Sequence, residues 1–333
     1  MFRSESRVKI AIATALVLFS GLFFLSCGGG ATKSVGIAKF VAHPALDAVE
    51  KGIVDELKAA KPDLEIDLQN SNGDMGTAAQ IAQRFKERKV AVAVGIATPT
   101  AQALVNQIKD RPVVYSVVTD PVAAGLVESM EKGGRNVTGT SDMTPVRAQL
   151  DMLLSMTPAR RIGHLYSSGE ANSAVLAEIV KAYCEEKGLE YVEATVTNSA
   201  EVKSALLAMA DRIDALYLGN DNTVFSALNA VSEVTLARKI PLMTADPSSA
   251  ETIPVLAALG YDYYMMGRAT GKIVLRILDG EKTADIPAYL PTAAEDLVLV
   301  LNEDVAAALG IVFAPELKER ASILISGGVA TKK

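Results

Sequence analysis

The stretch KVAVAVGIATPTAQALVNQIKDRPVVYSVVTD, from Lys89 to Asp120, decides the fold of this 333-residue chain. It holds two short valine-rich runs, Val90–Ala97 and Val113–Val118, which are typical of strands buried on both faces of a sheet. Between them, Thr98-Pro99-Thr100 begins a predicted helix, because proline suits the first helical turn and threonine can cap it. The order strand–helix–strand therefore predicts two parallel strands of an α/β fold.

Polar residues end both strands, at the edge where open α/β sheets bind their ligands. Thr98 and Thr100 follow the first strand, and Thr119-Asp120-Pro121 follows the second. Similar polar tips end later predicted strands, in Ser167-Ser168-Gly169-Glu170, Asn220-Asp221-Asn222 and Ala245-Asp246-Pro247. Any one tip could be an ordinary turn, because Asp, Asn, Ser and Thr are common there. If the two sheets face each other, the five tips converge on one cleft, which predicts a ligand site.

The chemistry of these tips suits a zwitterionic ligand. Hydroxyl and backbone N–H groups at helix N-termini favour a carboxylate, which predicts a role for Thr98, Thr100 and Thr119. An ionised Asp221, Asp246 or Glu170 suits an ammonium group. The tips hold no Arg or Lys, which argues against a phosphorylated ligand, and no aromatic ring, which argues against a sugar.

Composition and motifs exclude several classes of function. The chain has 33 basic and 39 acidic residues, a net charge of −6 and no basic run, so nucleic acid is not an expected partner. It contains no dinucleotide or phosphate loop and no serine nucleophile elbow, so neither a cofactor nor an enzyme is expected. No His or Cys cluster has metal-ligand spacing. Of the two histidines, His164 is expected to be packed within a strand, whereas His43 either lines a site or caps a turn.

The N-terminus has the pattern of a secretory signal peptide. Three basic residues precede the apolar run Ile10–Leu25, which is short for a transmembrane span. Leu25-Ser26-Cys27-Gly28 resembles a bacterial lipobox, with Phe24 at the position where leucine is usual. We expect residues 1–26 to be a signal peptide and residues 27–33 a tether anchored by lipid on Cys27. The alternative is an N-terminal anchor helix. Cys184 is expected to be a small core residue.

The rest of the chain alternates strands and helices in two successive blocks, which predicts two doubly wound domains with parallel sheets. The last third holds too few elements for a third domain. Its strands and helices are therefore expected to cross back and complete the two sheets. Residues 326–333 are expected to be disordered.

Seven segments, in order, resemble the substrate-binding lipoproteins of ABC transporters for tryptophan, tyrosine and related amino acids. They are HPALDAVEKGIVDELK (His43–Lys58), VGIATPTAQAL (Val94–Leu104), VTDPVAAGLV (Val118–Val127), NVTGTSD (Asn136–Asp142), YSSGEANS (Tyr166–Ser173), DNTV (Asp221–Val224) and LGYDYYMMGRATG (Leu259–Gly271). The resemblance extends over Val35–Val312. It implies a type I periplasmic-binding-protein fold, in which two flavodoxin-like lobes are joined by three hinge crossovers and enclose the ligand.

This resemblance also implies where the lobes begin and end. Lobe 1 would hold residues 34–141 and 261–285, and lobe 2 residues 142–260 and 286–325. The three crossovers would lie near Thr140–Pro145, Leu259–Asp262 and Asp285–Tyr289. Ligand contacts would come from both lobes and from the flanks of a side-chain pocket: Thr98, Thr100, Thr119 and Asp120 in lobe 1; Ser168, Glu170, Asn172, Asp221, Asn222 and Asp246 in lobe 2; and His43, Pro44 and Tyr261 beside them.

The function implied is capture of an amino acid, with an aromatic one (Trp, Tyr or Phe) expected. A monomer would close on the ligand at its hinge and deliver it to an ABC permease, from the periplasm or the outer cell surface, while lipid holds it to a membrane. The alternative is a sensor of the same fold that responds to another small molecule and feeds a membrane receptor. An exported α/β enzyme would need a nucleophile–base pair, which the sequence does not offer.

Overall fold

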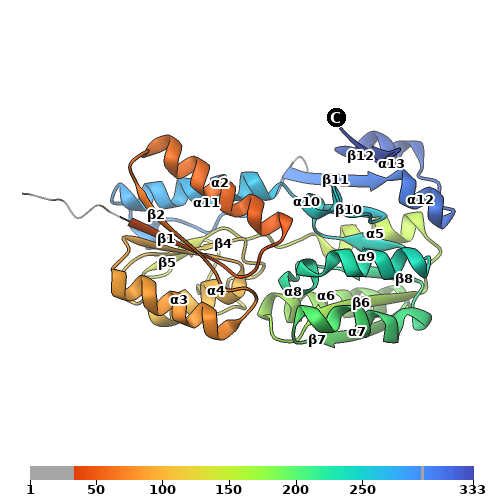
Figure 1. Ribbon diagram of the computed structural model, residues 1–333, viewed down its shortest axis with the longest axis horizontal. Helices are drawn as coiled ribbons and strands as arrows, with labels where there is room; N and C mark the ends of the chain where they lie inside the picture. Colours follow the sequence, from red (N-terminus) through yellow and green to blue (C-terminus); the bar gives the residue numbers. More distant parts are fainter. Residues whose placement is uncertain (1–33, 294–295) are drawn as a thin grey trace, which may run out of the picture. The chain divides into compact units, whose positions relative to one another are not determined.

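The computed structural model describes residues 34–293 and 296–333, and Ser34–Lys333 forms one compact unit. Two α/β lobes make up this unit (Figure 1). The predicted signal peptide and lipid tether, residues 1–33, lie outside the described residues. Within the described part, no helix combines the length and the apolar character needed to cross a membrane.

The first lobe is built on a five-stranded parallel sheet of order β2-β1-β3-β4-β5. Its strands are β1 (Ser34–Lys39), β2 (Glu65–Asn70), β3 (Val92–Ile96), β4 (Val113–Ser116) and β5 (Val137–Gly139). Helices α2 (Pro44–Ala60) and α11 (Tyr263–Leu278) pack on one face, and α3 (Met75–Arg88) and α4 (Thr98–Gln107) on the other. Every residue of β3 and β4 is buried, as the valine-rich runs predict. The strand order is that of flavodoxin-like folds.

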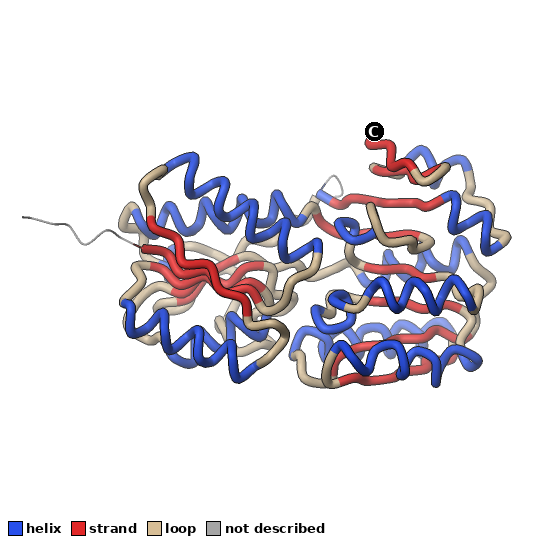
Figure 2. The backbone as a smooth tube through the Cα atoms, in the orientation of Figure 1, coloured by secondary structure: helices blue, strands red, loops and turns tan. Residues whose placement is uncertain are grey.

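The second lobe is built on an eight-stranded sheet of order β13-β12-β11-β10-β9-β8-β6-β7 (Figure 2). Its strands are β6 (Arg161–Ser167), β7 (Glu190–Val196), β8 (Ala215–Leu218), β9 (Leu242–Thr244), β10 (Ala257–Tyr261), β11 (Leu297–Asn302), β12 (Ile323–Ser326) and β13 (Val329–Lys332). Helices α5 (Val146–Met156) and α6 (Ala171–Lys187) belong to one core layer, and α7 (Val202–Met209), α8 (Asn222–Ser226) and α9 (Leu228–Ala237) to the other. The shorter helices α10 (Pro247–Ala250), α12 (Glu303–Leu309) and α13 (Pro315–Arg320) complete the lobe. The two-lobed fold is therefore as predicted.

The second sheet differs from the prediction in two respects. It is not wholly parallel, since β11 runs antiparallel to β10 and β13 antiparallel to β12. The expectation that residues 326–333 are disordered is wrong, because β13 pairs with β12. The pairing runs from Ser326 opposite Val329 to Ile323 opposite Lys332. Gly327 and Gly328 both have positive φ and form the tight turn between the two strands.

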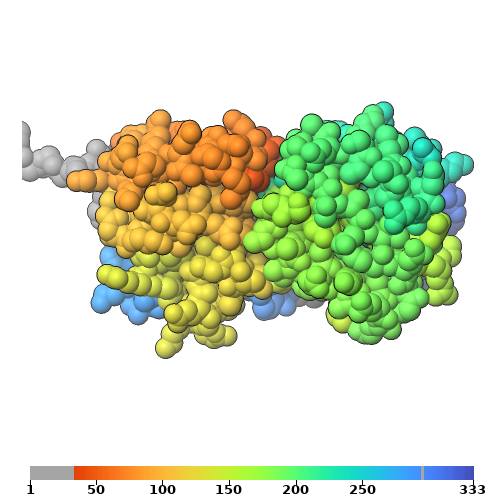
Figure 3. Space-filling model, turned by 90° about the horizontal axis from the view of Figure 1, so that it is seen from below, coloured from red at the N-terminus to blue at the C-terminus, as the bar shows by residue number. Residues whose placement is uncertain are grey.

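The chain passes between the lobes three times. It leaves the first sheet after β5, returns between β10 and α11, and leaves again before β11. Tyr289 still pairs with Thr140, and the Ile286 carbonyl accepts a hydrogen bond from Thr138 Oγ1 at 2.8 Å. The third passage therefore lies beyond Tyr289, later than the predicted Asp285–Tyr289. Figure 3 shows that the atoms of the two lobes meet along their boundary.

Candidate functional site

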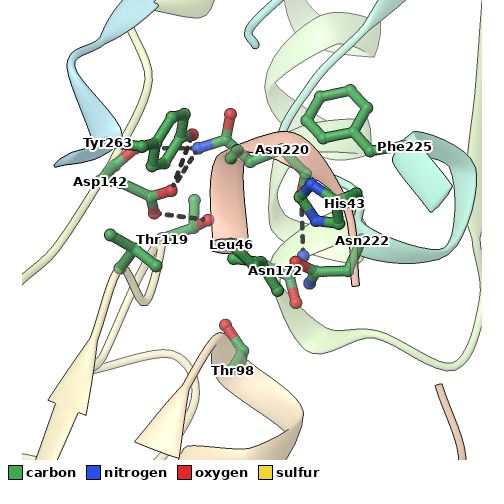
Figure 4. A pocket seen from close by; sticks show the side chains of 12 residues that line it. His43, Leu46, Thr98, Thr119, Asp142, Asn172, Asn220, Asn222, Phe225 and Tyr263 are labelled. Atoms are coloured by element: carbon green, nitrogen blue, oxygen red, sulfur yellow. Dashed lines mark hydrogen bonds between the residues drawn. The ribbon is translucent and has the colours of Figure 1, made fainter. Parts of the chain in front are cut away.

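A pocket lies between the lobes, at the carboxyl ends of the strands. Its free space is about 300 Å³ when parts open to solvent are counted, but the centre of a water molecule can reach only about 10 Å³ of it. That smaller volume holds about one water molecule. Twelve residues line the pocket (Figure 4): His43, Ala45, Leu46, Thr98, Val117, Thr119, Asp142, Asn172, Asn220, Asn222, Phe225 and Tyr263.

Asp142 is a buried carboxylate in the first passage between the lobes. It accepts hydrogen bonds from both lobes, from Thr119 Oγ1 at 3.2 Å, from Tyr263 Oη at 3.2 Å and from Asn220 Nδ2 at 2.9 Å. No Lys or Arg of the described segments pairs with it. Burial raises the pKa of the Asp142 carboxyl to about 7. A cation is the partner that this group lacks.

His43 lies at the other side of the pocket, immediately before α2. Its side chain does not cap that helix, and its ring meets Phe225 edge-on, with ring centroids 5.8 Å apart. The amide of Asn222 is close enough to favour the charged ring, but neither ring nitrogen makes a well-formed hydrogen bond within the described chain. Burial lowers the pKa of His43, so the ring is neutral at pH 7, although the charge of Asp246 acts in the opposite direction.

Two asparagine side chains add buried acceptors to the pocket. Asn172 Nδ2 donates to the Asn220 carbonyl at 2.8 Å, and Asn220 Nδ2 donates to Asp142. Neither Oδ1 atom has a hydrogen-bond partner among the described residues. Buried polar atoms are usually paired, so unpaired oxygens that line a pocket point to a ligand that donates hydrogen bonds.

The N-terminus of α4 borders the pocket at Thr98. The first N–H groups of a helix have no partner within the helix and attract negative charge. Ala97 precedes this helix with φ 77° and ψ 159°, a conformation that residues other than glycine rarely adopt. Val117, which lines the pocket after β4, also has a positive φ of 49°. Strained backbone at two neighbouring strand ends is typical of a functional site.

Of the thirteen ligand residues expected from the sequence, the structure brings five into this pocket: His43, Thr98, Thr119, Asn172 and Asn222. Four others hydrogen-bond to the protein backbone or lie at another surface hollow. Thr100 Oγ1 donates to the Ile96 carbonyl at 2.5 Å, and Asp120 accepts from the N–H groups of its own loop. Pro44 and Tyr261 line a different surface hollow. Ser168 is exposed and does not line the pocket.

Three predicted carboxylates do not line the pocket, and protein groups already hydrogen-bond to them. Asp221 caps α8 through Val224 N at 2.7 Å and also accepts from Ser173 Oγ at 2.7 Å. Asp246 caps α10 by accepting from Ser249 N at 3.1 Å. Glu170 accepts from the Asn222 amide at 2.5 Å and from two donors of Thr223. The expectation that these groups are free to meet a ligand ammonium therefore does not fit the geometry.

Seven pocket residues were not predicted: Ala45, Leu46, Val117, Asp142, Asn220, Phe225 and Tyr263. The sequence contains a pattern that could have predicted two of them. Asp142 follows the strand β5 as the other polar tips follow theirs, and Asn220 belongs to a tip that was recognised. Among the described residues, no group of three or more His, Cys, Asp or Glu is arranged to hold a metal ion.

Known proteins resemble this chain over most of its length. The family model described as "ABC transporter substrate binding protein" matches residues 34–324. A tyrosine-binding protein of Clostridioides difficile is 36% identical over 282 residues, covering 83% of this chain and 81% of that protein. The structure of an ABC domain from Streptococcus pneumonia in complex with L-Trp is 34% identical and covers 89% of this chain and 100% of its own, with a TM-score of 0.84.

A second similar structure has a lower TM-score. The ligand-free, open structure of a substrate-binding protein with adhesive properties from Clostridium difficile is 38% identical and covers 85% of this chain and 96% of its own. Its TM-score is only 0.63, although its sequence identity is slightly higher than that of the L-Trp complex. Sequence divergence therefore does not account for the lower structural similarity.

Proposed function

Because the chain belongs to the ABC transporter substrate-binding protein family, whose members bind solutes and are not enzymes, we propose that it captures an amino acid between its lobes and delivers it to an ABC importer. The tyrosine-binding protein and the L-Trp complex support an amino acid, and an aromatic one in particular. The observation that carries the proposal is Asp142, a buried carboxylate that has donors around it but no cation.

An ammonium group fits the Asp142 side of the pocket. A buried carboxylate is costly unless a positive charge or strong donors compensate it, and a ligand ammonium supplies both. Thr119, Tyr263 and Asn220 already hold the carboxylate in place, so the ligand meets a preorganised group. The N-terminus of α4 at Thr98 is the part of the pocket suited to the α-carboxylate.

The remaining lining suits an apolar side chain. Leu46, Val117 and Phe225 contribute carbon atoms to the wall, and no Lys or Arg is among the twelve lining residues. An aromatic amino acid would bury its ring against Leu46 and Phe225. An amino acid does not fit into the space open to water as the lobes now stand. Ligand entry therefore requires the lobes to separate, and the greater similarity to the L-Trp complex than to the open structure supports a closed arrangement.

The cellular setting of the proposal rests on the N-terminal sequence. A signal peptide over residues 1–26 and lipid on Cys27 would hold the protein at the outer side of a membrane, beside a permease. Labelling of expressing cells with a radioactive fatty acid, with Cys27→Ser as the control, tests this part on its own.

The ligand assignment is tested by isothermal titration of the purified protein with the twenty amino acids. We expect binding of Tyr or Trp, and we expect Asp142→Asn to weaken it by about 2–4 kcal/mol, because the ammonium loses its charged partner. Asp120→Asn is the matched control, since Asp120 was expected to contact ligand but does not line the pocket. Equal losses in the two variants, or none in Asp142→Asn, would contradict the role of Asp142.

A further inference from the structure

The side of the pocket near His43 holds a group that the proposed function does not yet use. His43 is only 5% exposed, and neither of its ring nitrogens has a hydrogen-bond partner within the described chain. A buried polar group that is left unpaired destabilises the folded protein. Because His43 does not cap α2, helix formation does not account for a histidine at this position.

His43 is distinct from the charged side of the pocket. Figure 4 shows His43 and Phe225 on one side and Asp142 with Tyr263 and Thr119 on the other. His43 comes from the first lobe, ahead of α2, whereas Phe225 comes from α8 of the second lobe. A ligand whose ammonium lies at Asp142 would therefore meet His43 with a different part of the molecule.

The chemistry of this side is that of a neutral imidazole beside an aromatic ring. A neutral imidazole presents one N–H donor and one acceptor nitrogen. A phenol can pair with either nitrogen, by accepting from the N–H or by donating to the acceptor, and an indole N–H can donate to the acceptor. The edge-on ring of Phe225, 5.8 Å from His43 between centroids, provides an apolar surface next to these polar atoms. A plain phenyl ring would leave both nitrogens unpaired.

We propose that His43 forms a hydrogen bond with the side chain of the ligand. The site therefore selects amino acids with an O–H or N–H group on an aromatic ring over phenylalanine. This inference rests on the proposed function, since it needs the ammonium at Asp142 to orient the ligand. A site built to hydrogen-bond a ligand group discriminates strongly against an analogue that lacks the group, because its own polar atoms then stay unpaired.

The experiment compares affinities within matched pairs of ligands by isothermal titration of the purified protein. L-Tyr is compared with L-Phe and 4-fluoro-L-phenylalanine, and L-Trp with 3-benzothienyl-L-alanine, in which sulfur replaces the indole N–H. We expect at least one natural amino acid to bind about a hundredfold more tightly than its partner without the hydrogen-bonding group. Ratios near one in both series, or a preference for Phe, Leu or Ile, would overturn the inference.

The variant His43→Phe keeps a ring against Phe225 and removes both nitrogens. We expect it to bind L-Phe about as tightly as the wild type does and to lose most of the preference for Tyr or Trp, which also shows that the variant folds. An unchanged preference would overturn the role of His43. His164→Phe is the matched control, because His164 is the other buried histidine and does not line the pocket. The preference should survive in that variant.

The ligand series separates this inference from the proposed function. Binding of no amino acid would refute both. Binding of amino acids without regard to an O–H or N–H group would leave the proposed function intact and refute only the role of His43. If His43→Phe does not fold, the ligand pairs on the wild-type protein still decide whether the site selects an O–H or N–H group on the ring.

Discussion

Asp142 and Asp221 are both buried carboxylates, and burial raises the pKa of each to about 7. Their partners differ. Asp221 is held by two backbone N–H groups and a serine hydroxyl inside the second lobe, and the charge of Glu170 adds to the rise of its pKa. Asp142 is held by side chains from two lobes and lines the pocket. In a sequence, a helix-capping aspartate and a pocket aspartate look alike. The polar residues at the strand ends therefore predicted the region of the site, but not that Asp142 is its charged group.

The raised pKa of Asp142 predicts how stability depends on pH. An Asp carboxyl has a pKa near 3.9 in an unfolded chain, so between about pH 4 and 7 the folded state binds a proton that the unfolded state does not. The contribution of Asp142 to stability is therefore full below pH 4 and is lost as pH rises through 7. Asp142→Asn should lack this loss, so its unfolding free energy relative to the wild type should rise by up to about 4 kcal/mol from pH 4 to 8.

Urea unfolding of both proteins without ligand, at several pH values, checks this expectation. A relative stability that stays constant with pH would show that the Asp142 carboxyl ionises normally in the folded protein.

Ala97 predicts a gain in stability from a single substitution. Its φ of 77° and ψ of 159° cost a non-glycine residue about 1–3 kcal/mol, and glycine adopts them freely. After the loss of chain entropy that glycine brings, Ala97→Gly should raise the unfolding free energy by about 1 kcal/mol. Ala101→Gly, inside α4, should lower it by about 1 kcal/mol and serves as the control. Urea unfolding that gives both variants the same sign would contradict strain at Ala97.

At the scale of elements, the pocket depends on the packing of α2 against α11. The two helices are far apart in the sequence and approach closely at glycines: a Cβ on Gly52 would lie 2.2 Å from the Tyr264 carbonyl, and one on Gly267 would lie 2.2 Å from the Val49 carbonyl. The N-terminus of α2 carries Leu46, and that of α11 carries Tyr263. Close packing of the helices thus brings both residues to one pocket.

Gly267→Ala should separate these helices. The added methyl group has no room against the backbone of α2, so we expect a loss of about 1–3 kcal/mol in unfolding free energy. Gly76→Ala is the control, because Gly76 is exposed in α3 and its nearest neighbour would be the Asp74 side chain at 3.3 Å. Thermal unfolding measures the stability of both variants. Equal stability of the two variants would show that the α2–α11 contact adapts easily.

How far the sequence predicts these elements depends on how local their cause is. The two central strands and α4 follow from valine runs and a Thr-Pro start, which act over a few residues. The glycine contact between α2 and α11 joins residues more than 200 positions apart, and no local pattern announces it. The β12–β13 turn has a local cause, since two adjacent glycines after a short apolar run favour a hairpin.

At the scale of the molecule, the charged side of the pocket is built on the passages between the lobes. Asp142 lies in the first passage, and Tyr263 begins α11 directly after the second. Asn220 donates to Asp142 from the second lobe, and Thr119 donates from the first. A ligand at Asp142 would therefore touch the segments whose backbone must rotate when the lobes move. The resemblance of the sequence implied three crossovers, but it could not reveal that one of them carries the pocket carboxylate.

This arrangement predicts that ligand shifts the protein toward the closed arrangement. A ligand can shift such an equilibrium only by its difference in affinity for the two states, and contacts to both lobes exist only when they meet. Val122 and Ser168 are exposed residues on different lobes, and α4 of the first lobe contacts α6 of the second. Fluorophores on cysteines at these positions should report mostly long distances without ligand and mostly short ones at saturation, by single-molecule energy transfer.

The labelling and its control follow from the structure. Cys184 is buried, and burial raises the pKa of its thiol to about 11, so it should not react, while Cys27 is replaced by Ser. Asp142→Asn in the labelled protein should need at least thirtyfold more L-Tyr or L-Trp to reach the same closed fraction, in line with the loss of about 2–4 kcal/mol in binding. If the wild-type distances do not change at saturating ligand, capture does not proceed by closure of the lobes. If Asp142→Asn closes at the same ligand concentration as the wild type, Asp142 does not couple the ligand to the hinge.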